Sequence, residues 1–309
     1  MSAIRTAGLR RVFGEVIAVA GLDLDVAAGE IFGLVGPDGA GKTTTMRMLT
    51  GILPPSGGRA EVAGFDVARE PERLKEHLGY MSQRFGLYPD LTVLENLAFY
   101  ADIYGVPRHE FTARTDRLLG FSNLTPFKQR LAGNLSGGMK QKLGLACALI
   151  HTPRVLFLDE PTNGVDPLSR RDFWRILYQL VREGVTIFVS TAYLDEAERC
   201  NRLALLHQGR LLGLGTPDEV KGLMPGALLE VRNAAPRPTA ALLRERLPDA
   251  TVGLFGDRVH VAVRDPGAAE KQIRQLLAAA GLEAPAIRGI EPSLEDVFVA
   301  VLATQPTPS

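Results

Sequence analysis

The stretch EIFGLVGPDGAGKTTT combines a short apolar run with the spacing G-x-x-x-x-G-K-T. Glycines at Gly36 and Gly41 let backbone N–H groups close around phosphate oxygens, and a helix that begins there adds partial positive charge. Lys42 is then placed to reach the β- and γ-phosphates, and the Thr43 hydroxyl to bind Mg²⁺. A chance glycine-rich turn would not explain the strand before and the helix after the motif. The stretch therefore predicts a nucleotide site formed by Gly36, Pro37, Asp38, Gly39, Ala40, Gly41, Lys42, Thr43 and Thr44.

An acidic pair follows a second apolar run, in VLFLDEP. Asp159 comes at the end of this strand-length run, where an aspartate holds the Mg²⁺ shell in P-loop NTPases. Glu160 follows directly and is placed to position or activate an attacking water. The alternative is that both carboxylates only cap the next segment. Because a phosphate loop occurs in the same chain, we favour the catalytic interpretation.

The segment LSGGMKQK holds a third candidate. Ser136 fits a helix N-cap, and Gly137 and Gly138 expose backbone N–H groups at the helix start, which makes a second anion site. Taken alone, this segment would be an ordinary helix cap. Its position upstream of VLFLDEP favours a functional role.

Composition limits the classes of partner. Lys and Arg total 35, as do Asp and Glu, so the charge balance does not indicate nucleic acid or an anionic lipid surface. Cys147 and Cys200 lie in apolar or amphipathic runs and indicate core thiols of a reducing compartment. No apolar run approaches the roughly 18 residues that span a bilayer. We expect a cytoplasmic protein, with any membrane crossing made by another chain.

The elements that must position these residues alternate between strand and helix up to about residue 220, which predicts an α/β fold with a largely parallel sheet. EIFGLVG, VLFLDE and TIFVST read as strands, and LALLHQGRLLGLG as a hairpin that turns at Gln208 and Gly209. Residues 223–302 predict β-α-β-β-α-β and a closing helix, the order of a small ferredoxin-like α+β domain. We expect residues 303–309 to be a disordered tail.

With these motifs in order, the chain resembles the ATP-binding cassette (ABC) family. GPDGAGKTT is similar to its Walker A motif, LSGGMKQ to its signature and VLFLDEP to its Walker B motif. Gln83 stands at the Q-loop, GVDP (164–167) at the D-loop and Phe13 at the aromatic residue that stacks on adenine. The resemblance implies a cassette over residues 1–222, with a RecA-like core sheet, an antiparallel β subdomain and a helical subdomain at about 85–150.

The resemblance also implies cofactors and residue roles. ATP and Mg²⁺ are the expected cofactors, and the catalytic residues are Glu160, Gln83 and Lys42. Mg²⁺ would be held by Thr43, Gln83 and Asp159. In this family the signature of one protomer covers the nucleotide of the other, so a head-to-tail dimer with two sandwiched ATP molecules is expected. Nucleotide contacts would then come from Phe13, from residues 36–44, and from Ser136, Gly137 and Gly138.

A finer resemblance is to ATPase subunits of ABC-2-type drug-resistance exporters, carried by GVDPLSRRDFW, STAYLDEAE and EPSLEDVFV. The similarity is to the amino-terminal cassette of YbhF-like ATPases, which carry two cassettes, whereas one is present here. It implies separate integral-membrane permease subunits and a position on the inner face of the plasma membrane. Aromatic residues after Gln83 are candidates either for permease docking or for the helical core: Phe85, Tyr88, Phe99 and Tyr104.

Two positions depart from the family pattern. Ala192 in VSTAYLDEAE stands where the family has its switch histidine, and Asp38 stands where it usually has asparagine. Losing one charge-assisted hydrogen bond to the transferring phosphate would cost roughly 1.5–3 kcal/mol. A carboxylate at Asp38 should repel phosphates unless a cation or water compensates. Glu160 and Gln83 are retained, so we do not expect the site to be catalytically inactive.

Several alternatives remain open at this point. A homodimer would lack the histidine at both sites, whereas a heterodimer would pair this chain with a histidine-bearing ATPase; nothing in the sequence demands a partner ATPase, which favours the homodimer. Outside transport, the chain could be a soluble ABC ATPase switch of translation or DNA maintenance. A nucleotide-binding regulator with weak hydrolysis is the third interpretation, because of Ala192 and Asp38.

Overall fold

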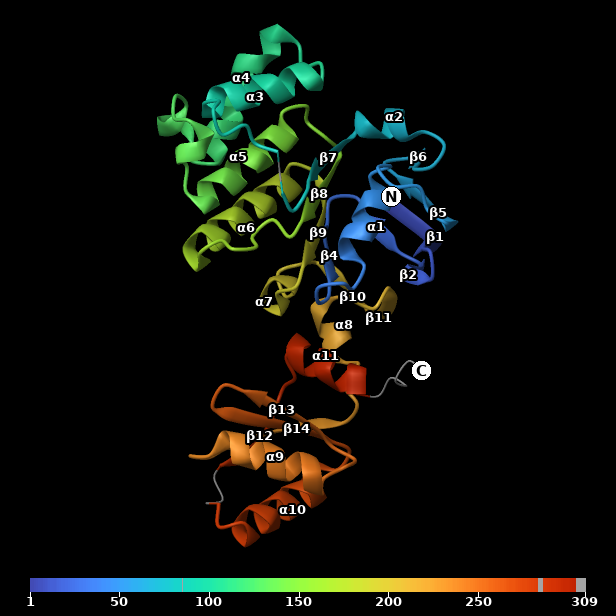
Figure 1. Ribbon diagram of the computed structural model, residues 1–309, viewed down its shortest axis with the longest axis vertical. Coiled ribbons are helices and arrows are strands. Elements are labelled where there is room, and N and C mark those ends of the chain that lie inside the picture. Colours follow the sequence, from blue (N-terminus) through green and yellow to red (C-terminus); the bar gives the residue numbers. More distant parts are fainter. Residues whose placement is uncertain (85, 283–285, 304–309) are drawn as a thin grey trace. The chain divides into compact units, whose positions relative to one another are not determined.

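Two units divide the chain, Met1–Leu212 and Gly213–Ser309. The computed structural model describes residues 1–84, 86–282 and 286–303 (Figure 1). The predicted domain limit at residue 222 lies beyond the division between the units. Most of the predicted tail, residues 304–309, and Phe85 of the predicted docking surface lie outside the described residues.

A six-stranded sheet forms the centre of the first unit, in the order β11-β10-β4-β9-β8-β7 (Figure 1). Its strands are β4 (Ile31–Val35), β7 (Leu78–Met81), β8 (Val155–Asp159), β9 (Thr186–Thr191), β10 (Arg202–His207) and β11 (Arg210–Gly215). From β10 to β7 each neighbouring pair is parallel, as predicted. The carboxyl ends of β4, β8 and β9 therefore meet at one edge, where ligands bind in open α/β sheets.

Both faces of this sheet are covered, because the strands are apolar on both sides. Phe32 and Phe188 stack at 5.4 Å between ring centroids on one face, which also packs against Met46 of α1 (Lys42–Leu49). The other face packs against α5 (Gly137–Leu149) and α6 (Pro167–Arg182), where Trp174 is buried. Burial of each such side chain stabilises the fold by roughly 1.5–3 kcal/mol.

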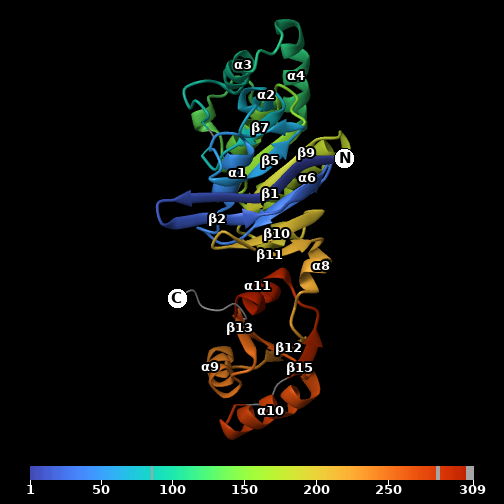
Figure 2. The same ribbon diagram turned by 90° about the vertical axis from the view of Figure 1, so that its right-hand side faces the viewer.

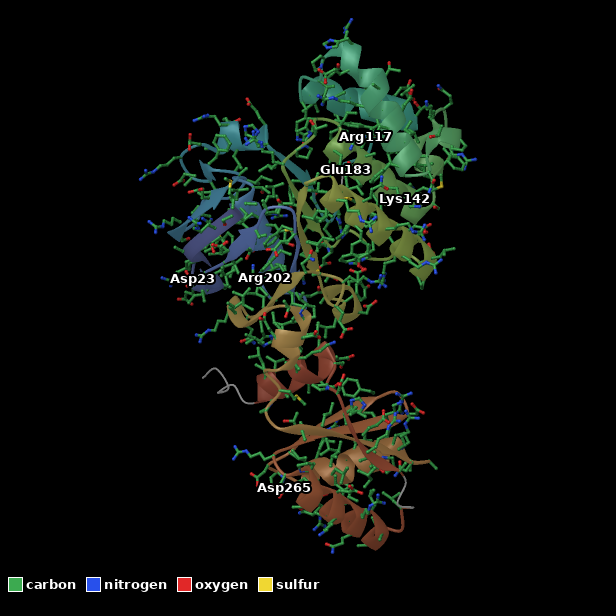
Figure 3. The ribbon with its side chains drawn as sticks, turned by 180° about the vertical axis from the view of Figure 1, so that it is seen from behind. Asp23, Arg117, Lys142, Glu183, Arg202 and Asp265 are labelled. Atoms are coloured by element: carbon green, nitrogen blue, oxygen red, sulfur yellow. The ribbon has the colours of Figure 1, made fainter. Side chains whose placement is uncertain are left out.

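An antiparallel sheet carries the chain's first residues, in the order β2-β1-β5-β6 with β3 paired to β1. The strands are β1 (Ser2–Phe13), β2 (Val16–Leu22), β3 (Asp25–Ala27), β5 (Gly57–Val62) and β6 (Phe65–Asp66), and the short α2 (Pro71–Lys75) follows. Asp23 accepts a 2.6 Å hydrogen bond from the Gly8 N–H, and the Arg202 guanidinium of β10 donates to the Asp25 carbonyl at 2.9 Å. Figure 3 labels the side chains of Asp23 and Arg202. This is the antiparallel β subdomain that the resemblance implied.

The helical part consists of α3 (Val93–Ile103), α4 (Arg108–Phe121), two short 3-10 turns (Thr125–Phe127 and Ala132–Asn134) and α5. A capping box at Thr92 and Glu95 begins α3. Of the predicted docking aromatics, Tyr88 and Tyr104 are 44% and 36% exposed, whereas Phe99 is half-buried with its ring against Tyr88. Docking by the exposed pair stays a prediction.

The second unit begins with the end of β11 and α8 (Pro217–Lys221) and contains a four-stranded sheet, in the order β13-β14-β12-β15. Its elements are β12 (Ala227–Arg232), α9 (Pro236–Arg246), β13 (Thr251–Phe255), β14 (Arg258–Val263), α10 (Pro266–Ala279), β15 (Ile287–Ile290) and α11 (Leu294–Ala303). Helices α9 and α10 lie on one face and α11 on the other (Figure 2). The predicted α+β order β-α-β-β-α-β, with a closing helix, is confirmed.

Glu230 occupies the middle of this sheet and is 2% exposed. It accepts hydrogen bonds from Arg232 and Arg288, both at 2.8 Å. Burial alone would raise the pKa of Glu230, but the two guanidinium groups outweigh it and lower the pKa from 4.5 to about 2. Because the folded-state pKa lies below the usual value, the resulting stability is present above about pH 4.5 and is lost as the pH falls toward 2.

Glu230→Gln is therefore expected to lower the free energy of unfolding by about 2 kcal/mol at pH 7, the scale of hydrogen bonds to a charged group. The difference in unfolding free energy between the variant and the wild-type protein should be smaller at pH 3, where the stability that the wild-type Glu230 carboxylate provides is partly lost. Urea unfolding followed by circular dichroism at both pH values measures this. Glu270→Gln, in an exposed pair with Arg274, is the control and should change little. An equal loss for Glu230→Gln at both pH values would contradict the argument.

Candidate nucleotide-binding site

The glycine-rich loop lies between β4 and α1, as the sequence predicts. Gly41 has φ +102°, and a Cβ there would lie 2.4 Å from the Ala18 carbonyl oxygen. At Gly36 a Cβ would lie 2.1 Å from the Leu206 carbonyl oxygen. Only glycine fits at these two positions, so the loop is held in a conformation that leaves its backbone near open space. The Gly36 N–H donates to the Thr191 carbonyl at 3.2 Å, which fixes the loop to the end of β9.

A cavity of about 530 Å³ opens over this loop. Asp38, Gly39, Ala40, Gly41, Lys42, Thr43 and Thr44 line it together with Gln83 and Glu160. The structure therefore brings together most of the predicted loop residues, among them Lys42, with Gln83 and Glu160, so that all three predicted catalytic side chains line one cavity. Four further lining residues had no motif in the sequence: Val16, Ile17, Ala18 and Gln208. Of these four residues the sequence indicates only Gln208, as part of the predicted hairpin turn with Gly209.

Lys42 is the buried cation of the site, with its side chain 4% exposed. Its ammonium lies 3.0 Å from a carboxylate oxygen of Glu160 and donates to the carbonyls of Gly36 and Pro37 at 2.8 and 3.1 Å. A buried lysine needs such partners, because an unpaired charge in the interior is costly. All three partners of the Lys42 ammonium are oxygen acceptors, as phosphate oxygens are. An anion that enters the cavity can therefore take their place beside Lys42.

Glu160 is held in an unusual backbone conformation, with φ +49°. Its N–H donates to the Ser190 hydroxyl at 3.0 Å and to the Ser190 carbonyl at 3.2 Å. Its side chain also accepts from the Gln83 amide at 2.9 Å. A non-glycine residue with positive φ is uncommon and is found at functional sites when the surroundings enforce it. Here β9 enforces it, and Glu160 faces both Lys42 and Gln83.

Asp159 supplies a buried oxygen without a protein partner. The residue is 1% exposed; one oxygen accepts from the Ser190 hydroxyl at 2.7 Å, and Oδ2 has no hydrogen-bond partner. Burial, together with the Asp159 charge, raises the pKa of the neighbouring Tyr80 to about 12. Helix α1, which carries Thr43, packs against β8. A buried carboxylate oxygen left unsatisfied fits a divalent cation such as Mg²⁺.

The predicted signature residues lie elsewhere in the unit. Ser136 caps α5 and accepts from the Met139 N–H at 3.3 Å, and Gly137 follows it. At Gly138 a Cβ would lie 2.5 Å from the Ser169 hydroxyl. None of Ser136, Gly137 and Gly138 lines the cavity over the glycine-rich loop. Within one chain, the two anion sites are therefore separate.

Phe13 lies at the end of β1, paired with Val16 of β2, and is 46% exposed. The Arg11 guanidinium lies 4.5 Å from the centre of its ring. Phe13 does not line the cavity itself, but the next residues of the hairpin, Val16 and Ile17, do. Both are exposed, at 65% and 45%, so an apolar edge stands beside the phosphate loop.

The two departures from the family pattern meet in one smaller pocket of about 140 Å³. Ala192 and Asp38 line it, and so does Glu160. The end of β9 thus does face the candidate site, with no side chain at residue 192 long enough to enter it. Asp38 is exposed, so water can compensate its charge.

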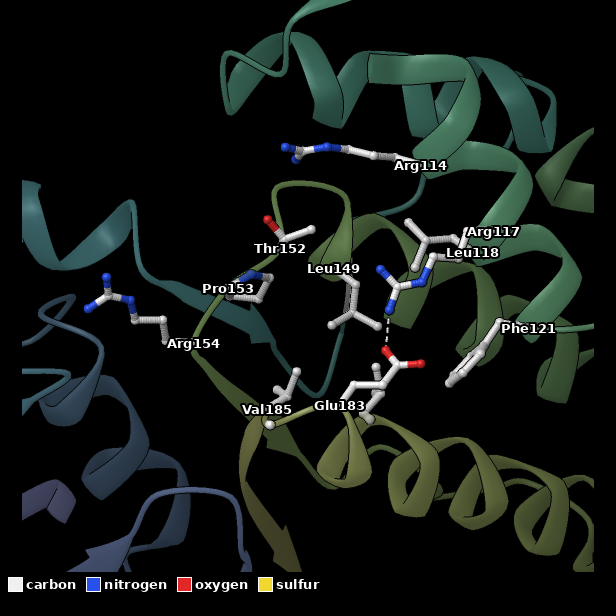
Figure 4. Close-up of a pocket in the computed structure, with 12 residues that line it drawn as sticks. Arg114, Arg117, Leu118, Phe121, Leu149, Thr152, Pro153, Arg154, Glu183 and Val185 are labelled. Atoms are coloured by element: carbon white, nitrogen blue, oxygen red, sulfur yellow. Dashed lines mark hydrogen bonds and ion pairs between the residues drawn. The ribbon is translucent and has the colours of Figure 1, made fainter. Parts of the chain in front are cut away.

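A separate cavity of about 290 Å³ lies at the opposite ends of β8 and β9, where Arg154 and Val185 precede these strands. Leu118, Phe121 and Leu149 give it apolar walls, and an ion pair between Arg117 of α4 and Glu183 crosses it (Figure 4). It shares no residue with the cavity over the glycine-rich loop. Neither a phosphate loop nor a carboxylate pair lines it, so it does not compete as the nucleotide site.

Comparison with known proteins agrees with this site. The family model described as "ABC transporter" matches residues 19–163. The chain is 46% identical over 286 residues to the probable multidrug ABC transporter ATP-binding protein YbhF of Escherichia coli (strain K12), covering 92% of this chain and 49% of that protein. The chain thus spans about half the length of this relative.

Other relatives match along almost their whole length. The daunorubicin resistance ATP-binding protein DrrA2 of Streptomyces coeruleorubidus is 36% identical over 302 residues, covering 96% of this chain and 94% of that protein. A solved ATP-binding subunit of an ABC transporter superposes with a TM-score of 0.65 at 30% identity, over 72% of this chain and 92% of that one. Because the similarity extends over both the cassette and the second unit, the chain belongs to the family of ABC transporter ATP-binding proteins.

Proposed function

We propose that this protein binds MgATP over the glycine-rich loop and hydrolyses it as one protomer of an ATPase dimer that powers an export-type ABC transporter. The observation that carries the proposal is the meeting of Lys42, Gln83 and Glu160 in one cavity above a loop that only glycine can form. A cation for phosphate and a carboxylate for water are the two groups that phosphoryl transfer to water requires.

The residues act as follows in the proposed reaction. Lys42 exchanges its contacts with Glu160 and two carbonyls for phosphate oxygens. Glu160, released from the lysine but still held by β9 through its backbone, orients the attacking water and accepts its proton on a carboxylate oxygen. Gln83 keeps the Glu160 side chain directed at the cavity. Mg²⁺ supplies charge neutralisation on the phosphates when it is held by Thr43, Gln83 and Asp159.

A second protomer completes the site in this proposal. Ser136, Gly137 and Gly138 offer N–H groups at the start of α5 but do not line the cavity of their own chain. In a head-to-tail dimer they would face the nucleotide of the partner, with Phe13 beside the adenine. We favour a homodimer; a heterodimer with a histidine-bearing ATPase is the alternative.

Export is the transport role that the relatives support, since their names include multidrug transport, daunorubicin resistance and Nod factor export. Among the described residues no helix is long and apolar enough to cross a membrane. We propose that separate integral-membrane permease subunits of the ABC-2 type hold the protein on the inner face of the plasma membrane. A soluble switch and a weakly hydrolysing regulator are not favoured by these relatives. Recovery with membranes only when permease subunits are co-expressed would separate export from a soluble role.

Sedimentation velocity tests the dimer directly. Glu160→Gln should dimerise in MgATP and stay monomeric in MgADP or with EDTA, because ATP joins the two protomers and is not consumed. Adding Ser136→Glu should abolish dimerisation while leaving ATP binding intact, since the new carboxylate would repel the partner's phosphates. The same mass in all these conditions would overturn the composite site.

A further inference from the structure

A tyrosine just after the end of β9 is linked to Glu160 through one intervening side chain. Tyr193, directly after Ala192, lies with its hydroxyl 3.4 Å from the Asn163 side-chain oxygen and donates to it. The Asn163 amide in turn donates to Glu160 Oε2 at 3.4 Å. Both residues line the 140 Å³ pocket beside Ala192. A chain of two hydrogen bonds therefore joins β9 to the carboxylate expected to activate water.

Tyr193 is held in place from several sides. The Arg170 guanidinium lies 4.3 Å from the centre of its ring, a cation–π contact. Its N–H donates to the Thr191 hydroxyl at 3.0 Å. The ring is 37% exposed, so these contacts, rather than burial, fix its direction.

A buried carboxylate fixes both ends of this bridge. Glu196 is fully buried and accepts from Thr162 at 2.6 Å and from Thr191 at 2.9 Å. Thr162 immediately precedes Asn163, and Thr191 supports the Tyr193 N–H. Arg170 lies 3.5 Å from the same carboxylate. The buried Glu196 carboxylate thus fixes the segment after Glu160 relative to the end of β9.

We propose that Tyr193 and Asn163 are positioning residues that orient Glu160 in this chain, in which Ala192 offers no hydrogen bond to the transferring phosphate. The inference rests on the proposed ATP hydrolysis. Both hydrogen bonds are 3.4 Å long, and catalytic hydrogen bonds commonly tighten when substrate is bound. Tyr193 acts only through Asn163, so its loss should lower kcat without changing nucleotide binding.

The activity test compares two hydroxyl deletions. Tyr193→Phe keeps the ring on Arg170. Tyr178→Phe, the control, removes the hydroxyl of a similarly exposed residue, which donates to the Arg199 carbonyl at 3.5 Å. Tyr193→Phe should lower kcat about 3- to 10-fold with KM unchanged, the scale of one neutral hydrogen bond. Tyr178→Phe should retain wild-type values.

A second readout does not depend on activity. In the nucleotide-free protein, Tyr193→Phe should shift the side-chain amide resonances of Asn163 in ¹⁵N-correlated NMR spectra. Those of Asn96 in α3, whose amide donates to backbone carbonyls just before that helix, should stay unchanged. Unchanged Asn163 resonances, or equal kcat for the two tyrosine variants, would overturn the positioning role alone. Absence of turnover in the wild-type protein would overturn the proposed hydrolysis and this inference together.

Discussion

Glu160→Gln is expected to reduce the rate of ATP hydrolysis by about 10²- to 10⁴-fold, the usual contribution of a positioned general base. Glutamine has nearly the same shape, so it can keep the contact with Gln83 and the backbone bonds to Ser190. What it cannot do is accept the proton of the attacking water. ATP affinity should be retained or improved, because one negative charge is removed beside the phosphates and Lys42 is released from its ion pair.

Single-turnover hydrolysis and fluorescent-nucleotide binding measure the two effects separately. Glu183→Gln makes the same chemical change at the opposite end of the strands, in the ion pair with Arg117, and should leave kcat unchanged (Figure 4). A Glu160→Gln protein that hydrolyses ATP within 3-fold of the wild-type rate would exclude Glu160 as the base.

Lys42→Met gives the second large effect, because it removes the buried cation of the cavity. MgATP affinity should fall roughly 10- to 100-fold, corresponding to about 1.5–3 kcal/mol for a hydrogen bond to a charged group. The rate constant kcat should also fall by about 10²–10³-fold, since the ammonium also stabilises charge that develops in the transition state. Isothermal titration calorimetry with MgATP and steady-state kinetics check these values.

Stability has to be controlled in this variant. Lys42→Met leaves the Glu160 carboxylate, 10% exposed, without its cation, so the fold itself should lose stability. Adding Glu160→Gln should restore stability but not nucleotide affinity. Lys75→Met, at an exposed lysine paired with Glu72, serves as the matched control and should bind MgATP normally. Wild-type affinity in Lys42→Met would show that the phosphates lie elsewhere.

Local patterns in the sequence predict much of the fold. The hairpin turn at Gln208 and Gly209 is one example: both residues have positive φ, +46° and +74°, as the two-residue turn requires. The apolar runs form β4, β8 and β9, and the glycine-rich spacing places Lys42 at the first residue of α1. These features depend on neighbours in the chain, which is why spacing and residue type were sufficient.

Contacts between strand ends were not predictable in the same way. The sheet places β9 between β4 and β8, so residues about 30 positions apart become partners: the Glu160 N–H with Ser190, and Asn163 with Tyr193. No local pattern indicates strand order or the direction of a tyrosine side chain. The ion pair between Lys42 and Glu160 likewise depends on the whole sheet. For the same reason the sequence shows only a missing side chain at Ala192 and does not indicate that Tyr193 is linked through Asn163 to the Glu160 carboxylate.

The most direct test of the central claim is the rate of phosphate release from ATP by the purified wild-type protein, measured with Mg²⁺ and with EDTA. We expect turnover that requires Mg²⁺ and exceeds that of Glu160→Gln by at least 10²-fold, because Lys42, Gln83 and Glu160 already converge on one cavity. Turnover no faster than that of Glu160→Gln, in a protein that binds MgATP and forms the dimer, would contradict the proposed hydrolysis.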